Sequence, residues 1–238
     1  MPQQIEYSVV IPLYNEEEPL PVLQEELHAA MESLGRDYEI IYVNDGSTDS
    51  SLEALLALKE KYPKIRIISL MKNKGQCKAL AAGFRAALGE WIITLDADLQ
   101  NPPSEIWKLL EFKNGYDLIT SRRKRRKDSY SKIIASMLAR LIRFMVLGDT
   151  CKDAGAALRI YRRSMIGRIP LFRRFYFYFP YLARTRGFKV KEIDVEHRHR
   201  RYGRSKYGNL KRAAEGAVDL WKVRRIVKKA GRLPVWSQ

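Results

Sequence analysis

The sequence predicts an α/β protein built on a doubly wound, mostly parallel sheet. Short apolar runs rich in β-branched and aromatic residues alternate regularly with segments whose apolar residues recur at helical spacing. Most of these runs are hydrophobic without alternation, which is typical of parallel strands covered on both faces. Polar, turn-forming residues directly follow the runs, as expected where strands end in loops.

The first half is expected to contain five strands alternating with four helices. The strands are predicted at residues 8–13, 39–43, 65–70, 91–95 and 117–121, and the helices at 16–34, 52–62, 79–88 and 104–113. Asn15 is a candidate N-cap for the first helix, because an Asn side chain accepts hydrogen bonds from helical N–H groups. Gly83, inside the third helix, indicates close packing on the sheet, because Gly lets two backbones approach.

The second half has a different character. Strands are predicted at 156–161 and 190–195, and amphipathic helices at 129–147 and 209–229. The aromatic cluster at 175–179 fits a packed core better than the alternative, a lipid groove. No repeat or low-complexity linker divides the chain. We therefore expect one domain at 1–207, with halves at 1–121 and 122–207, followed by a basic amphipathic helix and tail at 208–238.

The formal net charge of +17 is distributed unevenly. Residues 1–121 contain 11 Lys and Arg against 19 Asp and Glu, a net −8, and residues 122–238 contain 33 against 8, a net +25. Such a basic half indicates a polyanionic partner: nucleic acid, an anionic membrane surface or a phosphorylated substrate. Cys77 and Cys151 are too few for a disulfide framework or a zinc site, so we expect a reducing, cytosolic setting. We expect neither a membrane-spanning helix nor a secretory leader.

Two carboxylates follow the strand predicted at 91–95. Asp96 and Asp98 are two residues apart, with Gln100 two further on. Ligands bind at the carboxyl ends of strands in open α/β sheets, and oxygen donors of this kind suit Mg²⁺ or Mn²⁺. A pair of solvated loop aspartates is the alternative for so short a motif.

Short motifs follow the predicted strands in a fixed order. They are Pro12-Leu13-Tyr14-Asn15-Glu16, Asn44-Asp45-Gly46-Ser47-Thr48-Asp49, Asn73-x-Gly75, Asp96-Ala97-Asp98-Leu99-Gln100 and Ser121-Arg122. Together they resemble family 2 glycosyltransferases of the GT-A fold over roughly the first half of the chain. No G-x-G-x-x-G follows the first strand and no Walker A motif occurs, which excludes dinucleotide dehydrogenases and P-loop enzymes.

Motifs in the second half resemble the polyprenyl-phosphate branch of that family, which includes dolichol-phosphate mannose synthases and undecaprenyl-phosphate relatives. They are Asp153-Ala154-Gly155 with Arg159, and Val195-x-His197-x-x-Arg200-x-x-Gly203-x-Ser205-Lys206-Tyr207. Two departures are Asn44, where many members have Asp, and Ala156-Ala157, in place of a small-aromatic pair.

The resemblance implies a role for each matching residue. Residues 1–121 would be the nucleotide half and residues 122–207 the acceptor half. The nucleotide-sugar ligands would be Pro12, Tyr14, Glu16, Val43, Asp45, Asp96, Ala97, Arg122, Arg200 and Lys206. The metal ligands for Mg²⁺ or Mn²⁺ would be Asp96, Asp98 and Gln100. The acceptor phosphate would be bound by Arg122, Ser205 and Lys206, and the catalytic residues would be Asp98, Arg122 and Arg200.

The acceptor can be argued from its chemistry. A hydroxyl acceptor needs a general base, whereas a phosphate monoester, with a second pKa of about 6, arrives largely ionised. This chemistry favours a phosphate acceptor. The resemblance implies metal-dependent, inverting transfer of a sugar from GDP-mannose or a UDP-sugar to a polyprenyl phosphate. The alternatives are a glycan hydroxyl acceptor and, more remotely, a nucleic-acid-binding protein on a degenerate scaffold. We expect the chain to lie peripherally on the cytoplasmic face of an anionic membrane, or to rely on a membrane-protein partner.

Overall fold

The structure is a computed structural model that describes residues 5–124, 130–199 and 219–228, with the backbone alone for 130–135. It confirms the predicted α/β class. Seven strands form one sheet in the order β3-β2-β1-β4-β6-β5-β7. The strands are β1 (Tyr7–Leu13), β2 (Tyr38–Asn44), β3 (Ile65–Ser69), β4 (Trp91–Thr94), β5 (Leu118–Arg123), β6 (Arg159–Arg162) and β7 (Val190–Val195). Only β6 runs antiparallel to its neighbours, β4 and β5.

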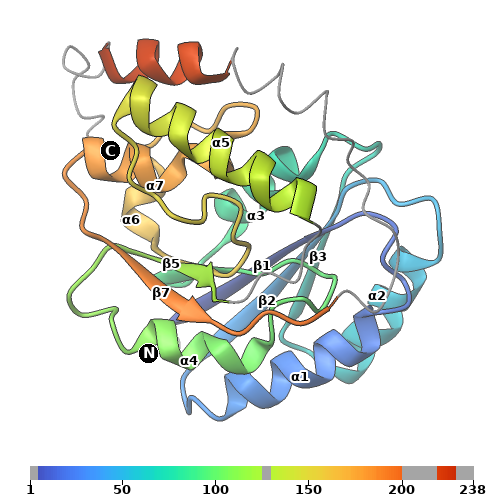
Figure 1. The fold of residues 1–238 in the computed structure, drawn as a ribbon. Helices are drawn as coiled ribbons and strands as arrows, with labels where there is room; N and C mark the ends of the chain where they lie inside the picture. Colours follow the sequence, from blue (N-terminus) through green and yellow to red (C-terminus); the bar gives the residue numbers. More distant parts are fainter. Residues whose placement is uncertain (1–4, 125–129, 200–218, 229–238) are drawn as a thin grey trace.

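Helices cover both faces of the sheet (Figure 1). They are α1 (Leu20–Glu32), α2 (Ser51–Lys61), α3 (Gln76–Ala86), α4 (Ile106–Leu110), α5 (Tyr130–Leu147), α6 (Arg163–Ile166) and α7 (Phe175–Thr185), with a 3₁₀ turn at Pro103–Glu105 and further helix at residues 219–228. The helices α1, α2 and α4 pack on one face and α3, α6 and α7 on the other. Every helix within the described ranges is too short or too polar to cross a bilayer.

Two apolar cores follow from the period-two alternation of strand side chains. In β1, Val9 and Ile11 face the core under α1, whereas Val10 faces the core under α3. The aromatic residues of α7 belong to the second core, where Phe175 and Phe179 are almost completely buried. The core interpretation of the 175–179 cluster is therefore confirmed.

Gly83 lets α3 lie directly on the sheet. A Cβ atom at this position would come within 2.3 Å of Val10 Cγ1 and 3.2 Å of Val43 Cγ2. This close approach confirms the packing predicted from the sequence.

The strand order creates a topological switch point between β1 and β4. The chain builds β1, β2 and β3 in one direction and then returns to place β4 on the other side of β1. The β1–β4 pairing ends at Val10 and Thr94, whereas β1 continues beside β2 as far as Leu13 and Asn44. The segments that follow β1 and β4 therefore diverge here, which is where ligands bind in open α/β sheets.

Two local predictions were wrong. The first helix begins at Leu20 with Pro19 at its N-cap, so Asn15 does not cap it. Asn15 instead lies at φ 52° and bonds across to the loop after β2, which we describe below. The helix expected at 104–113 is shorter than predicted. Its first residues form the 3₁₀ turn at Pro103–Glu105, and the α-helix that follows, α4, ends at Leu110.

Candidate active site at the carboxyl edge of the sheet

The loop after β2 is tied to the loop after β1 by polar side chains. Asn15 Oδ1 accepts a hydrogen bond from Thr48 N at 2.8 Å, and Ser47 Oγ accepts one from Asn15 N at 2.9 Å. Asn44 Oδ1 accepts from Ser47 N at 2.9 Å, so the residue at this departure from the family pattern holds its own turn together. These contacts fix two strand-end motifs beside the switch point.

Asp45 organises the loop that precedes α3. It is 3% exposed, and its two carboxylate oxygens accept hydrogen bonds from Lys74 N and Gly75 N, each at 2.8 Å. A carboxylate has about four acceptor sites, so these two bonds leave capacity for a ligand N–H.

Gly46 is required by the approach of that same loop. Its φ is +67°, and an added Cβ would lie 2.6 Å from the Lys72 carbonyl carbon and 2.8 Å from Asn73 N. These neighbours are backbone atoms, which cannot rotate away. The Asn-Asp-Gly turn and the 72–75 loop therefore form one packed unit.

The Asp-x-Asp turn follows β4 at the switch point. Asp98 is 6% exposed, and its Oδ1 accepts a hydrogen bond from Gln100 N at 3.1 Å. Asp96 Oδ1 accepts one from Gln76 Nε2, at the start of α3, at 2.7 Å. Leu99, which directly follows Asp98, lies at φ 59°, a strained conformation for a branched apolar residue and of the kind that clusters at functional sites.

The donor set at this turn fits a divalent cation that is shared with a substrate. Among the residues that the structure describes, no group of three or more His, Cys, Asp or Glu is arranged to hold a metal alone. Mg²⁺ is usually held by one or two carboxylates together with substrate phosphates and water. Asp96 and Asp98, with the Gln100 amide nearby, provide that smaller set.

The segment after β7 lies against the Asp-x-Asp turn. Arg198 N donates to Gln100 O at 2.8 Å, and Arg198 Nη1 contacts both carboxylate oxygens of Glu26 on α1, at 2.8 and 2.9 Å. The segment is thus joined to both α1 and the turn. Of the predicted site residues, Arg200, Ser205 and Lys206 lie outside the described residues.

A basic hollow of about 260 Å³ opens at the end of β5. Its lining residues are Arg122, Arg123, Lys124, Arg140, Lys152, Asp153 and Asp194. Arg122 forms a bidentate pair with Asp194, and Arg123 forms one with Asp153, whose two contacts are each 2.7 Å. The hydrogen bonds from Arg122 lower the pKa of Asp194, so that carboxylate stays charged and keeps the arginine in place.

The hollow and the Asp-x-Asp turn share one edge of the sheet. In the strand register, Arg159 pairs with both Thr94 of β4 and Thr120 of β5. With neighbouring strands about 4.8 Å apart, the Cα atoms of Thr94 and Thr120 lie about 10 Å from each other. Asp96 and Arg122 each follow two residues later, so the acidic turn and the basic hollow are neighbours.

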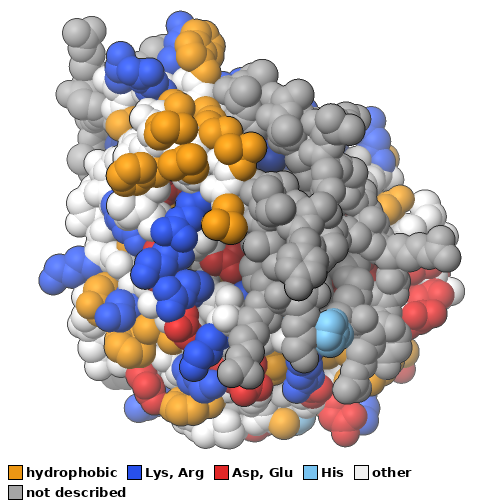
Figure 2. Space-filling model, viewed as in Figure 1, with side chains coloured by type: hydrophobic (Ala, Val, Ile, Leu, Met, Phe, Trp, Pro, Cys, Tyr) orange, Lys and Arg blue, Asp and Glu red, His pale blue; other side chains and the backbone are white. Residues whose placement is uncertain are grey.

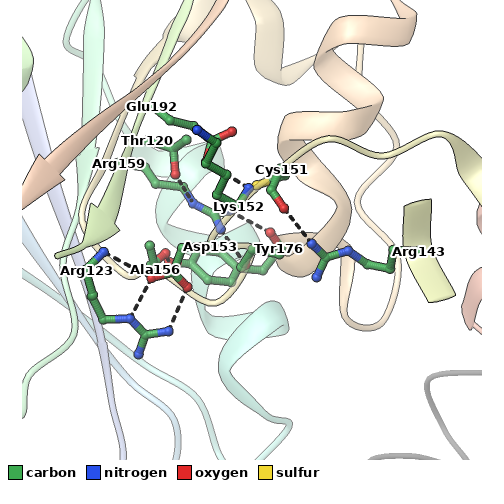
Figure 3. A network of polar contacts seen from close by, with 11 residues as sticks. Thr120, Arg123, Arg143, Cys151, Lys152, Asp153, Ala156, Arg159, Tyr176 and Glu192 are labelled. Carbon is green, nitrogen blue, oxygen red and sulfur yellow. Dashed lines mark hydrogen bonds and ion pairs between the residues drawn. The ribbon is translucent and has the colours of Figure 1, made fainter. Parts of the chain in front are cut away.

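Arg159 holds the segment between these two sites (Figure 3). Its side chain is fully buried and donates to Thr120 Oγ1 at 3.1 Å, Tyr176 O at 2.6 Å and Ala154 O at 2.6 Å. Burial raises the pKa of Tyr176 far above its usual range, so its hydroxyl keeps its proton and donates to Ala156 O. Arg159 therefore shapes the 153–158 segment and is too deep to touch a substrate.

The remaining predicted site residues lie at the same edge. Pro12 and Val43 pair across β1 and β2, and both are buried. The Val43 side chain packs in the core under α3, and Val43 is paired on both sides in the sheet, with Pro12 of β1 and Ile68 of β3. Ala97 is buried between the two aspartates, and Tyr14 and Glu16 are half-buried in the loop after β1.

Four basic residues of the hollow were not singled out from the sequence: Arg123, Lys124, Arg140 and Lys152. Arg123 and Lys124 belong to the basic run that starts at Arg122, so that run was the available signal. Arg140 and Lys152 come from α5 and the loop after it, and nothing in their local sequence indicates that they meet.

Comparison with known proteins gives concordant results. The model of a family described as "Glycosyl transferase family 2" matches residues 8–169. Two similar curated proteins are undecaprenyl-phosphate 4-deoxy-4-formamido-L-arabinose transferases, from Pectobacterium carotovorum (44% identical over 206 residues) and Photorhabdus laumondii (43% over 207). In both cases the match covers 86% of this chain and 63% of the relative, so the chain spans less than two thirds of their length.

Similar solved structures have the same fold at low identity. Mannosyl-3-phosphoglycerate synthase from Rubrobacter xylanophilus has a TM-score of 0.69 at 15% identity, covering 98% of this chain and 77% of that one. Glucosyl-3-phosphoglycerate synthase from Mycobacterium tuberculosis, in complex with Mn²⁺, UDP-glucose and glycerol 3-phosphate, has a TM-score of 0.65 at 17% identity, covering 97% and 82%.

Proposed function

Because this chain belongs to glycosyl transferase family 2, we propose that it moves one sugar from a nucleotide-sugar to a polyprenyl phosphate such as undecaprenyl phosphate. The observation that carries the proposal is the basic hollow beside the acidic turn at one edge of the sheet. One site suits a nucleoside diphosphate with a cation, and the other suits a second phosphate. The names of the curated relatives include undecaprenyl phosphate, which supports a lipid phosphate as the acceptor.

The donor diphosphate would bind at the switch point. Asp96, Asp98 and Gln100 would hold Mg²⁺ or Mn²⁺, which supplies positive charge as the leaving diphosphate gains negative charge. Asp45 would accept a hydrogen bond from the base, and the loop after β1 would contact the nucleotide. The glucosyl-3-phosphoglycerate synthase solved with Mn²⁺ and UDP-glucose has the same fold, which supports a metal at this edge.

The acceptor phosphate would bind in the basic hollow. Arginine suits phosphate because its planar fork bonds two oxygens at once. Arg122 and Arg123 are held in place by Asp194 and Asp153, so their guanidinium groups would meet the phosphate without first being ordered. Arg200, Ser205 and Lys206 would complete the phosphate contacts.

The same hollow favours a phosphate over a hydroxyl as the attacking group. Its two lining carboxylates, Asp153 and Asp194, are each paired with an arginine, and the hydrogen bonds from Arg122 lower the pKa of Asp194, which makes Asp194 a poor proton acceptor. A phosphate needs no such base. A direct displacement by its oxygen, opposite the leaving diphosphate, would invert the anomeric carbon.

The direct test is transfer of radiolabelled sugar into an organic-extractable, mild-acid-labile product. Undecaprenyl phosphate would be the acceptor, and the donors would be GDP-mannose, UDP-sugars and a nucleotide-linked 4-deoxy-4-formamido-L-arabinose. We expect Asp98→Ala and chelation to abolish transfer, and Glu60→Ala, an exposed carboxylate on α2, to leave it unchanged. Label that enters soluble glycan alone would refute the lipid acceptor, and normal turnover by Asp98→Ala would refute the metal assignment.

A further inference from the structure

The outer face of α5 is apolar. Its exposed side chains lie at i, i+1, i+4, i+7 and i+8 and so occupy one side of the helix. They are Met137 (67% exposed), Leu138 (56%), Leu141 (52%), Phe144 (55%) and Met145 (66%), and we call them the apolar face of α5. Figure 2 shows these hydrophobic side chains gathered over α5, with Lys and Arg side chains next to them. A contiguous patch of this kind marks an interaction surface.

Contacts on the inner side hold the helix in this orientation. Arg143 Nε donates to Asp149 Oδ2, and Arg143 Nη2 to Cys151 O, both at 2.9 Å. Ile142 and Leu147 pack against the core under α7. The helix therefore packs Ile142 and Leu147 inward beside Arg143 and still presents a second apolar row outward, whereas an ordinary surface helix has a polar outer face.

The helix at residues 219–228 extends the same surface. Leu220 and Val223 are buried in the core that Ile142 and Leu147 also contact, and Figure 1 draws the two helices next to each other. On its outer side Trp221 is 58% exposed, with the Arg225 guanidinium 4.2 Å from the ring centroid. Its neighbours Lys222, Arg224 and Lys228 are exposed as well. An aromatic ring flanked by cations is typical of a membrane–water interface.

We propose that the apolar face of α5, together with Trp221, docks on an anionic lipid bilayer and inserts to the depth of the headgroups. The proposal rests on the proposed function and adds the orientation in which the enzyme meets its lipid. Arg140 of α5 lines the basic hollow, so the hollow lies beside the docking face. A phosphate at the membrane surface would enter it while the prenyl chain stays in the bilayer.

The charge around the apolar face of α5 favours an anionic bilayer over a second copy of this chain as its binding partner. The surface belongs to the half with a net +25, and Lys124, Arg140 and Lys152 line the hollow beside it. A second copy would bring like charges together, whereas anionic headgroups are attracted.

The test is sedimentation with vesicles of phosphatidylcholine and phosphatidylglycerol in equal parts, and with vesicles of phosphatidylcholine alone. We expect salt-sensitive binding to the anionic vesicles. The double variant Leu141→Asp, Phe144→Asp should reduce the partition coefficient by about tenfold or more. The matched control is the double variant Leu88→Asp, Trp107→Asp. Leu88 follows α3 and is 56% exposed, and Trp107 lies on α4 and is 51% exposed, so both resemble Leu141 and Phe144 in exposure. This control should bind vesicles as the native chain does. Unfolding midpoints check that both variants fold.

Native binding by the α5 variant, or equal loss in the control, would overturn the docking surface. So would a native dimer that the α5 variant dissociates, because the face would then belong to a second copy. Transfer to a short, water-soluble prenyl phosphate separates the two proposals. The α5 variant should retain that transfer and lose transfer to vesicle-embedded acceptor, whereas a native chain that binds vesicles but transfers to neither acceptor would refute the proposed function alone.

Discussion

Replacing Gly46 with Ala tests whether the turn after β2 and the 72–75 loop act as one unit. The new Cβ would meet backbone atoms of Lys72 at 2.6 and 2.7 Å, and the residue would keep a φ of +67°. The left-handed conformation costs about 1–2 kcal/mol for Ala. Overpacking against backbone adds about 1–3 kcal/mol. We therefore expect the free energy of unfolding to fall by about 2–5 kcal/mol.

Gly35→Ala is the matched control. Gly35 has a φ of +59°, but an added Cβ there meets nothing within 4 Å. This variant carries the conformational cost alone, so it should lose about 1–2 kcal/mol. Urea unfolding with an unchanged m-value would measure both changes.

The two variants should also differ in nucleotide affinity. Relief of the clash moves the loop whose Lys74 and Gly75 amides hold Asp45. A hydrogen bond to a charged group contributes about 1.5–3 kcal/mol, so we expect binding of a nucleoside diphosphate with Mn²⁺ to weaken by roughly ten- to a hundredfold. Titration calorimetry should find native affinity in Gly35→Ala. Equal destabilisation and equal affinity in the two variants would refute the reasoning.

Two further predictions concern the buried arginine and the acceptor phosphate. Arg159→Met removes three buried hydrogen bonds and leaves their acceptors without a donor, so the free energy of unfolding should fall by about 3 kcal/mol. Urea unfolding measures this change, and an unchanged midpoint would contradict the structural role of Arg159. Transfer to prenyl phosphate should fall as pH drops through about 6, where the phosphate gains a proton. The Arg122–Asp194 pair does not titrate near that pH, because Arg122 lowers the pKa of Asp194 below its ordinary value. The pair therefore stabilises the fold fully above the ordinary Asp pKa, and this contribution is lost only at lower pH, as the pH falls through the lowered pKa. Asp194→Asn should therefore slow transfer without moving the midpoint of the pH profile, and a shifted midpoint would place Asp194 in the titration.

Local sequence patterns predicted much of the fold and part of the candidate site. Apolar runs and helical spacing predicted all seven strands, because each pattern records which side of a short segment is buried. Gly83 indicated close packing, and the contact with Val10 confirms it. The Asp96–Asp98 pair was recognised because chain order alone puts both carboxylates at the end of a buried strand.

Local sequence patterns could not predict the contacts between segments that are distant along the chain. Arg122 and Asp194 are 72 residues apart and meet because β5 and β7 pair in parallel. Asn15 was expected to cap a helix, yet it bonds to a loop 33 residues away. A polar side chain takes the nearest geometry that satisfies it, and only the packed strands determine what is near.

The sequence by itself determined the α/β class, the family and the acidic turn, because these depend on the order and spacing of residues along the chain. The tertiary structure decided which side of α5 faces outward. The same periodic pattern could bury its apolar row, but Arg143 bonds inward to Asp149 and Cys151, and this turns Met137, Leu141 and Phe144 to the surface. It also gathered Arg140 and Lys152 with Arg122 into one hollow, because the charges of a chain acquire a common site only when folding brings their backbones together.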